Sequence, residues 1–469
     1  MLFNSYEFAI FFPVVFLTYL CLRRRWQNRW LLLASYVFYG AWDWRFLGLI
    51  WLSTIVDFWA GRRIQAADDS RARRFPLIIS MVANLGLLAT FKYFNFFIES
   101  FCYLFGIAEC PVTLNVLLPV GISFYTFQTM SYTIDIYRRK LEPCRDFVTF
   151  ALFVAFFPQL VAGPIERAVN LLPQIGSDRK ITWSKVGNGL YMMYWGLFKK
   201  IVIADSLGAM ADHWFAMSSL TSSQTYLAML CFALQIYCDF SGYSDIARGC
   251  ARCMGFELML NFNIPYIATN PQEFWRRWHI SLSTWLRDYL YISLGGNRRG
   301  NRTTYRNLAL TMLLGGLWHG AAWTFIAWGA YHAILLMVHR LMIPSLKQIV
   351  PAAGWRRRLS VVAGVVFFFH LTLIGWLLFR AETITQAWQM LLSLFVTLPE
   401  PSVLTAGMAK VGLYLAPLVI VQICQLRSDD PEVVRSWHPL ARAVWYALLL
   451  WGILVFGSFG KQAFIYFQF

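Results

Sequence analysis

The chain has 469 residues, of which 58% are hydrophobic and 18% aromatic, while only 14% are charged. An ordinary soluble protein carries about 25% charged residues, so the composition excludes that class and indicates a chain that lies mostly in a membrane. The 41 Lys and Arg residues exceed the 24 Asp and Glu residues, which gives a net charge of +17. The positive residues form short clusters between apolar segments, a pattern typical of membrane topology, and we expect no nucleic-acid partner.

Apolar segments recur along the whole chain, beginning with residues 1–22, which lack the basic start and cleavage site of a signal peptide. We therefore expect an all-α polytopic membrane protein, a single domain over residues 1–469, with roughly 11–14 membrane helices, some of them tilted or re-entrant. The predicted helices cover residues 7–22, 29–42, 46–60, 76–93, 94–109, 113–134, 147–164, 187–204, 225–247, 307–320, 322–338, 359–379, 411–424 and 442–459.

Clusters of basic residues between these helices set the expected orientation in the lipid bilayer. The positive-inside bias places them in the cytoplasm, and both termini then lie outside. Residues 261–306 are too polar to span, and their interleaved Trp, Tyr and Leu residues predict interfacial or re-entrant helices on the cytoplasmic side. The clusters cover residues 23–29, 62–74, 138–145, 276–306, 340–358 and 427–442.

The nine cysteines are scattered, so we expect no disulfide framework. Cys250 and Cys253 have the spacing of half a zinc site, but no second pair follows, and zinc needs about four ligands. We expect no metal ion. The sequence also has no nucleophilic serine elbow, phosphate-binding loop, dinucleotide fingerprint or zinc-protease motif, so a hydrolytic triad is not indicated.

His319 is a candidate site residue because ionisable side chains inside a bilayer are costly and are often functional. Gly315, Gly316 and Gly320 surround it in the segment LLGGLWHGA, and their missing side chains let a substrate or another backbone approach closely. A neutral imidazole has an ordinary pKa of about 6.5 and can take a hydroxyl proton at physiological pH. The alternative is a histidine that hydrogen-bonds between helices.

His279 is the second candidate, in the segment EFWRRWHISLSTWLRDYLYI. The positive charges of Arg276, Arg277 and Arg287 favour an anionic cofactor, because guanidinium groups bind phosphate with two hydrogen bonds. Trp278, like Trp275 and Trp285, could flank an adenine ring. The alternative is simple anchoring of the segment at the lipid headgroups, where Arg and Trp are common.

Two carboxylates lie late in an apolar helix. Asp239 and Asp245 are six residues apart and face different sides of that helix, so a catalytic carboxylate pair is not expected. Asp245 is three residues from Arg248 and can pair with it, whereas Asp239 could orient a catalytic histidine. The remaining histidines, at positions 213, 332, 339, 370 and 438, are expected to be structural or interfacial.

Six segments together resemble the membrane-bound O-acyltransferase family, in the bacterial branch that contains the membrane subunits of alginate or cellulose acetylation and the D-alanyl transferases of lipoteichoic acid. The resemblance covers nearly the whole chain, and the segments around His279 and His319 resemble the two histidine motifs of the polysaccharide-acetylating members. The segments are residues 118–128, 157–167, 240–245, 274–296, 315–320 and 464–469.

The resemblance implies a ring of tilted helices around a central funnel in a bacterial inner membrane. It implies an O-acetyltransferase that takes acetyl from cytoplasmic acetyl-CoA, used as a substrate with no resident cofactor, and serves an exopolysaccharide through periplasmic SGNH-type partner proteins. His319 is the expected general base. The oxyanion donor could be His279 or a backbone or indole N–H, and Trp318 and Asp239 are expected to support the site.

Other functions remain compatible with intramembrane polar residues. A transporter or flippase would move the acyl donor or the polymer without chemistry, and it would show inverted repeats with ion sites at the membrane midplane. An inactive scaffold for periplasmic partners would tolerate loss of both histidines. A D-alanyl-type transfer to a cell-wall polymer is the alternative within the enzyme class.

Overall fold

The computed structural model describes residues 1–469 except 108–109, 111, 115–116, 162, 350–352, 461–463 and 468–469. The described residues form helices and turns without a β-strand, which confirms the predicted all-α class. They divide into two compact units, Met1–Tyr194 with Tyr243–Met259 and Trp195–Gly242 with Leu260–Phe469. The expected single domain stays a prediction.

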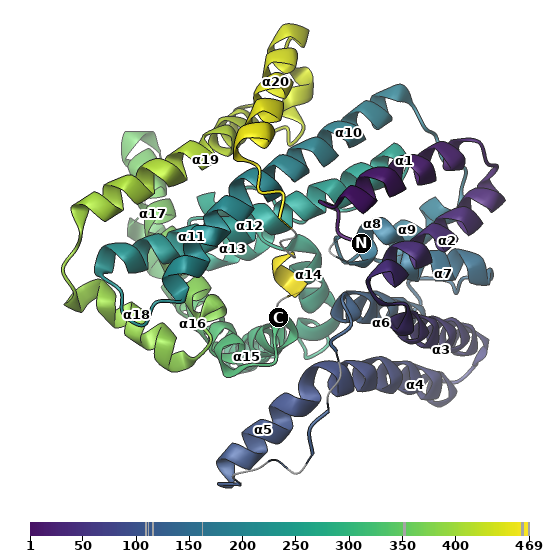
Figure 1. Cartoon of the computed structure of the whole chain (residues 1–469). Helices are drawn as coiled ribbons and strands as arrows, with labels where there is room; N and C mark the ends of the chain where they lie inside the picture. Colours follow the sequence, from purple (N-terminus) through teal and green to yellow (C-terminus); the bar gives the residue numbers. More distant parts are fainter. Residues whose placement is uncertain are drawn as a thin grey trace. The chain divides into compact units, whose positions relative to one another are not determined.

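The first unit is built mainly from helices that precede Tyr194 (Figure 1). Helices α3, α4 and α6 pack against one another, and α2 packs against α7. The helices are α1 (Tyr6–Leu20), α2 (Arg24–Asp43), α3 (Leu47–Ala66), α4 (Ser70–Leu88), α5 (Phe94–Leu104), α6 (Ile122–Tyr137), α7 (Phe147–Ala155), α8 (Phe157–Leu160), α9 (Ala168–Gly176) and most of α10 (Trp183–Phe198).

The second unit holds the C-terminal half of the chain. Its most extensive helix contact joins α15 to α16, and α17 packs on the other side of α16 (Figure 1). The helices are α11 (Asp205–Phe215), most of α12 (Ser222–Cys253), α13 (Pro271–Arg277), α14 (Ile280–Trp285), α15 (Gly300–His319), α16 (Trp323–Ile349), α17 (Gly354–Arg380), α18 (Ile384–Val396), α19 (Pro401–Ser428) and α20 (Pro439–Phe456).

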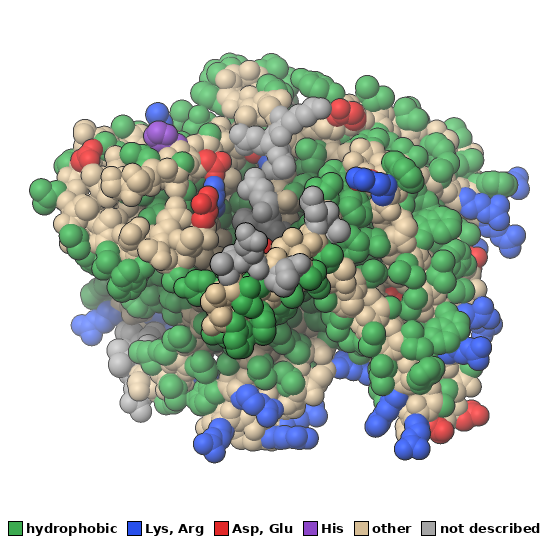
Figure 2. All heavy atoms as spheres, turned by 60° about the horizontal axis from the view of Figure 1, so that its bottom comes forward, with side chains coloured by type: hydrophobic (Ala, Val, Ile, Leu, Met, Phe, Trp, Pro, Cys, Tyr) green, Lys and Arg blue, Asp and Glu red, His purple; other side chains and the backbone are tan. Residues whose placement is uncertain are grey.

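Five described helical segments are long and apolar enough to cross a membrane: Ser70–Leu104, Trp323–Ser345, Gly354–Arg380, Pro401–Ser428 and Pro439–Phe456. Many of their large apolar side chains point outward, where a lipid environment rather than water accounts for their exposure. Figure 2 shows one face of the molecule, on which Lys and Arg side chains occur in separate groups and hydrophobic side chains cover much of the rest. These features fit a multi-pass membrane protein.

Several predicted helix boundaries are wrong, and proline and glycine explain two of them. The helix predicted over 147–164 ends at Ala155, where Pro158 restricts the backbone, and only the short α8 follows. The helix predicted over 113–134 begins at Ile122, because Gly121 caps it with a φ of 77°.

The remaining differences are helices that were joined, lengthened or missed. The segments predicted at 76–93 and 94–109 form one helical stretch, with a π-helical turn over Ala89–Tyr93. Helix α15 begins at Gly300 rather than at 307, since its polar first turns lack the apolar pattern used to find it. Helices α9 and α18 were missed, being only 9 and 13 residues long.

Some predicted boundaries lie outside the described residues. These are the predicted helix end at 108–109, part of the predicted start at 113–116, residues 350–352 of a basic cluster, and the last two residues of the segment 464–469.

The orientation of the basic clusters gives a testable expectation. Cysteines placed at Arg71 and Arg357, both exposed, should react with a membrane-impermeant thiol reagent only after the cells are permeabilised, because the positive-inside bias predicts that both clusters lie in the cytoplasm. The parent chain, with its exposed Cys21, sets the background. Labelling of either position in intact cells would show that the expected orientation is wrong.

Candidate active site

Close backbone packing positions His319 at the end of α15. A Cβ atom on Gly316 would overlap the carbonyl oxygen of Phe325, and one on Gly329 would overlap that of Met312, so these glycines let α15 and α16 touch. His319 is the last residue of α15 and is 4% exposed. The sequence predicted that the glycines near His319 let either a substrate or another backbone approach closely. Gly316 allows the second of these, the close approach of a backbone.

His279 occupies an unusual backbone position between α13 and α14. Its φ of 41° and ψ of 54° lie in the left-handed region, which costs a residue with a Cβ about 1–2 kcal/mol. Asn261 holds the turn: its carbonyl accepts the Ile280 N–H at 2.9 Å and its side-chain oxygen accepts the Ser281 hydroxyl at 2.6 Å. Such strain clusters at functional sites.

Burial sets the charge of His279. The side chain is fully buried, and its Nδ1 lies 3.4 Å from the Ser281 hydroxyl. Desolvation of the charged form lowers the pKa of His279 to about 3. The imidazole is therefore neutral at physiological pH, with one ring nitrogen as donor and the other as acceptor.

The two candidate histidines lie in one aromatic cluster of the second unit. Their ring centroids are 6.4 Å apart. The ring of Trp318 is 6.0 Å from His279 and 5.0 Å from His319. Tyr466, from the C-terminal segment beside α14 (Figure 1), has its ring 6.3 Å from His279 and 5.7 Å from His319. Trp328 is a further neighbour, 5.0 Å from His319.

A buried ion cluster fixes that C-terminal segment. The ammonium group of Lys200 lies 2.8 Å from a carboxylate oxygen of Asp205 and 3.0 Å from one of Asp239. The other oxygen of Asp239 accepts the backbone N–H of Ile465 at 2.9 Å. Asp239 thus holds the residue next to Tyr466, and it contacts neither histidine among the described residues.

A cavity of about 620 Å³ connects the surface to His319. Its lining includes the exposed side chains of Arg276, Arg287 and Arg340, and the buried His319 and Trp328. The cavity therefore joins a cationic entrance to a buried imidazole. This arrangement can hold an anionic group near the surface while a reactive group attached to it reaches His319.

The structure separates the sequence-predicted donor-site residues. Arg276 and Arg287 line the cavity, although Arg287 also pairs with Asp288 at 2.7 Å. Arg277 does not line it: it pairs with Glu273 at 3.0 Å and donates to the Asn263 carbonyl at 3.1 Å. Trp278 also lies outside the lining, buried in an aromatic cluster in which it stacks on Phe274 with ring centroids 5.6 Å apart.

Sequence reasoning did not single out Arg340, Trp328 or Lys200. Arg340 belongs to a predicted basic cluster, and Trp328 and Lys200 belong to predicted apolar helices, with no feature that marks them as site residues. Asp245 and Arg248 approach within 3.8 Å on one helix, as their spacing predicts. No group of three or more metal-ligating side chains occurs in the described part of the chain.

Comparisons with known proteins bear on this site. The family model of membrane-bound O-acyltransferases matches residues 114–379, which include His279, His319 and the whole cavity lining. A probable alginate O-acetylase of Pseudomonas aeruginosa is 46% identical over 94% of this chain and 85% of its own length. A peptidoglycan O-acetyltransferase of Helicobacter pylori is 36% identical over 83% of the chain and 79% of its length. A teichoic acid D-alanyltransferase of Bacillus subtilis is 27% identical over 57% of this chain and 70% of its own length.

Proposed function

This chain belongs to the membrane-bound O-acyltransferase family, and we propose on that basis that it takes acetyl from cytoplasmic acetyl-CoA and passes it across the membrane for O-acetylation of a bacterial exopolysaccharide. As a member of the family it is a membrane O-acyltransferase. Acetyl is proposed over D-alanyl because the relatives named as O-acetylating enzymes match at 46% and 36% identity, against 27% for the D-alanyltransferase.

The observation that carries the proposal is the cavity between the arginines and His319. Acetyl-CoA has phosphates at one end and a thioester at the other, so it needs a cationic entrance and a narrow, deep interior. Arg276 and Arg340 supply the charge, and His319 lies at the buried end. Gly315 lines the wall, where it adds no side chain to obstruct the thioester arm.

In the proposed reaction His319 is the general base. Its neutral imidazole takes the proton of the acceptor hydroxyl as the hydroxyl oxygen attacks the thioester carbonyl. The tetrahedral intermediate then collapses, the carbon–sulfur bond breaks, and the imidazolium returns its proton to the leaving thiolate. One ester and one thiol form from one thioester and one alcohol, so no further reactant is needed.

His279 is the second proposed site residue, as a donor to the carbonyl oxygen on which negative charge develops. It suits this role because burial keeps it neutral, and a neutral imidazole still carries one N–H. Its ring lies outside the cavity lining. The indole N–H of Trp318, whose ring lies 5.0 Å from that of His319, is the alternative donor.

The proposed acceptor is a hydroxyl group. An exopolysaccharide of the alginate type fits the name of the Pseudomonas relative, and one of the cellulose type has the same reactive group, a sugar hydroxyl. We propose that periplasmic SGNH-type proteins place the acetyl group on the polymer, so the first acceptor is a side chain of such a partner or the polymer itself.

Charge reversal at the cavity entrance tests donor binding. Arg276→Glu should raise the KM for acetyl-CoA by about tenfold or more, because it removes a charge-assisted phosphate contact and adds repulsion. Initial rates of acetyl transfer in isolated membranes give the KM, and immunoblots give the abundance of the protein.

Arg277→Glu is the matched control, one residue away and outside the cavity lining. Reversal there places a carboxylate beside Glu273 and breaks the bond to Asn263, so it should reduce abundance while the surviving enzyme keeps its KM. If Arg276→Glu behaves in the same way as Arg277→Glu, the segment is only an interface anchor and the donor site lies elsewhere.

A further inference from the structure

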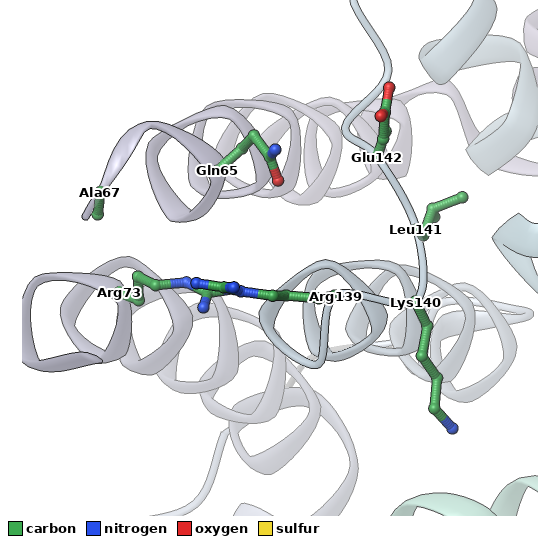
Figure 3. A pocket seen from close by; sticks show the side chains of 7 residues that line it. All are labelled: Gln65, Ala67, Arg73, Arg139, Lys140, Leu141 and Glu142. Carbon is green, nitrogen blue, oxygen red and sulfur yellow. The ribbon is translucent and has the colours of Figure 1, made fainter. Parts of the chain in front are cut away.

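A second hollow, of about 340 Å³, lies in the first unit, remote in sequence from the histidine motifs. Gln65 near the end of α3, Arg73 in the first turn of α4, and the residues that follow α6 line it (Figure 3). Those last residues include Arg139, Lys140 and Glu142. Nothing in the proposed acyl transfer uses this hollow.

Arg73 is fixed in place by the end of α6. One of its terminal nitrogens donates to the carbonyl of Tyr137 at 2.9 Å and to that of Ile136 at 3.3 Å. Its guanidinium carbon also lies 5.5 Å from the centre of the Tyr137 ring. The remaining N–H donors of the guanidinium group stay available to a ligand, since the side chain of Arg73 makes no further hydrogen bond with a described residue.

Arg139 occupies a position that normally favours glycine. Its N–H donates to the Ile136 carbonyl and the N–H of Lys140 to that of Asp135, at 2.9 and 2.8 Å, the pattern of a helix end closed by a left-handed residue. Arg139 has a φ of 59°, which costs about 1–2 kcal/mol for a residue other than glycine. Its side chain forms no hydrogen bond or ion pair with any described residue.

The two guanidinium groups point toward each other in the hollow (Figure 3). Glu142 lines the same hollow but forms an ion pair with neither, and Lys140 extends away from them. Arg73 and Arg139 therefore place two like charges together with one unpaired carboxylate nearby. An anion between the guanidinium groups would offset their repulsion, and phosphate matches their hydrogen-bonding geometry.

The hollow also lies at the start of a candidate membrane span. Arg73 belongs to the segment Ser70–Leu104, in which Phe75, Ile78 and Val82 are large, apolar and more than half exposed. An arginine at the start of such an apolar span typically lies at headgroup level, beside a surface that faces the hydrocarbon chains. We propose that this hollow binds the phosphate group of an anionic phospholipid.

Arg139→Gly tests the site with little risk to the fold, because glycine adopts the required φ without strain. The purified full-length chain, in detergent, is titrated with phosphatidylglycerol or phosphatidylcholine, and bound lipid is counted by native mass spectrometry. Arg145→Gly is the matched control, an exposed arginine outside the lining. Wild type and Arg145→Gly should bind phosphatidylglycerol alike, and Arg139→Gly should bind it about tenfold more weakly.

Two results would overturn the proposal. One is equal binding of phosphatidylglycerol by Arg139→Gly and wild type, which would leave the arginines as helix caps only. The other is that inorganic phosphate alone displaces phosphatidylglycerol at equal concentration, which would make the ligand a soluble phosphate. Binding of phosphatidylcholine should be the same in all three proteins.

Discussion

His319→Ala should reduce acetylation of the polymer by about 10²–10⁴-fold, the usual contribution of a general base. Polymer purified from cells that carry the variant should contain almost no acetyl, measured by NMR against the sugar signals. The protein should still insert, because His319 ends α15 and its removal does not disturb the contact that Gly316 makes with α16.

His332→Ala is the matched control for removing a buried imidazole. His332 is 1% exposed on α16, and its ring lies 4.7 Å from that of Trp328, but it does not line the cavity. This variant should lose some stability while each remaining molecule keeps its activity. Normal polymer acetylation by a well-expressed His319→Ala protein would remove His319 from the mechanism.

Lys200→Met should destabilise the folded protein strongly. Lys200 is 1% exposed and is shared by two buried carboxylates, Asp205 and Asp239. Removing one partner of a buried ion pair costs about 3–5 kcal/mol, because it leaves uncompensated charge in a medium that solvates it poorly. The thermal unfolding midpoint in detergent and the yield of folded protein should both fall sharply.

Two further variants separate this effect from a general loss of lysine. Lys180→Met replaces an exposed lysine and should leave the midpoint unchanged. The triple change Lys200→Met, Asp205→Asn and Asp239→Asn removes the stranded charges and should recover part of the stability. An unfolding midpoint for Lys200→Met equal to that of wild type would show that the cluster contributes little to the fold.

Local sequence patterns were sufficient to select His319, which lies at the buried end of the candidate site. His319 stands out because it is an ionisable residue in an apolar helix. The glycines around it predict a close approach of another backbone, and Gly316 makes such a contact with α16. The same reasoning selected Arg276 and Arg287. It could not separate Arg276 from Arg277, since adjacent helix residues point about 100° apart and their directions depend on tertiary packing.

Contacts between distant segments could not be predicted in this way. Arg340 and Arg276 line the same cavity because α13 packs against α16. No sequence spacing rule relates these two arginines. Asp239 was a predicted partner for a histidine, but it pairs with Lys200 and holds Ile465, 226 residues away. Lys200 lies within a helix predicted from its apolar residues, and nothing in the local sequence indicates a buried ion pair.

The most direct test of the central claim is the release of CoA from acetyl-CoA added to the cytoplasmic face of inverted membrane vesicles. The vesicles contain the pathway partners and equal amounts of wild-type or His319→Ala protein, and vesicles without the protein set the background. Wild type should release CoA as labelled acetyl appears on an acceptor at the opposite face, and His319→Ala should do neither. Transfer by His319→Ala at the wild-type rate, or movement of label by wild type without CoA release, would contradict the central claim.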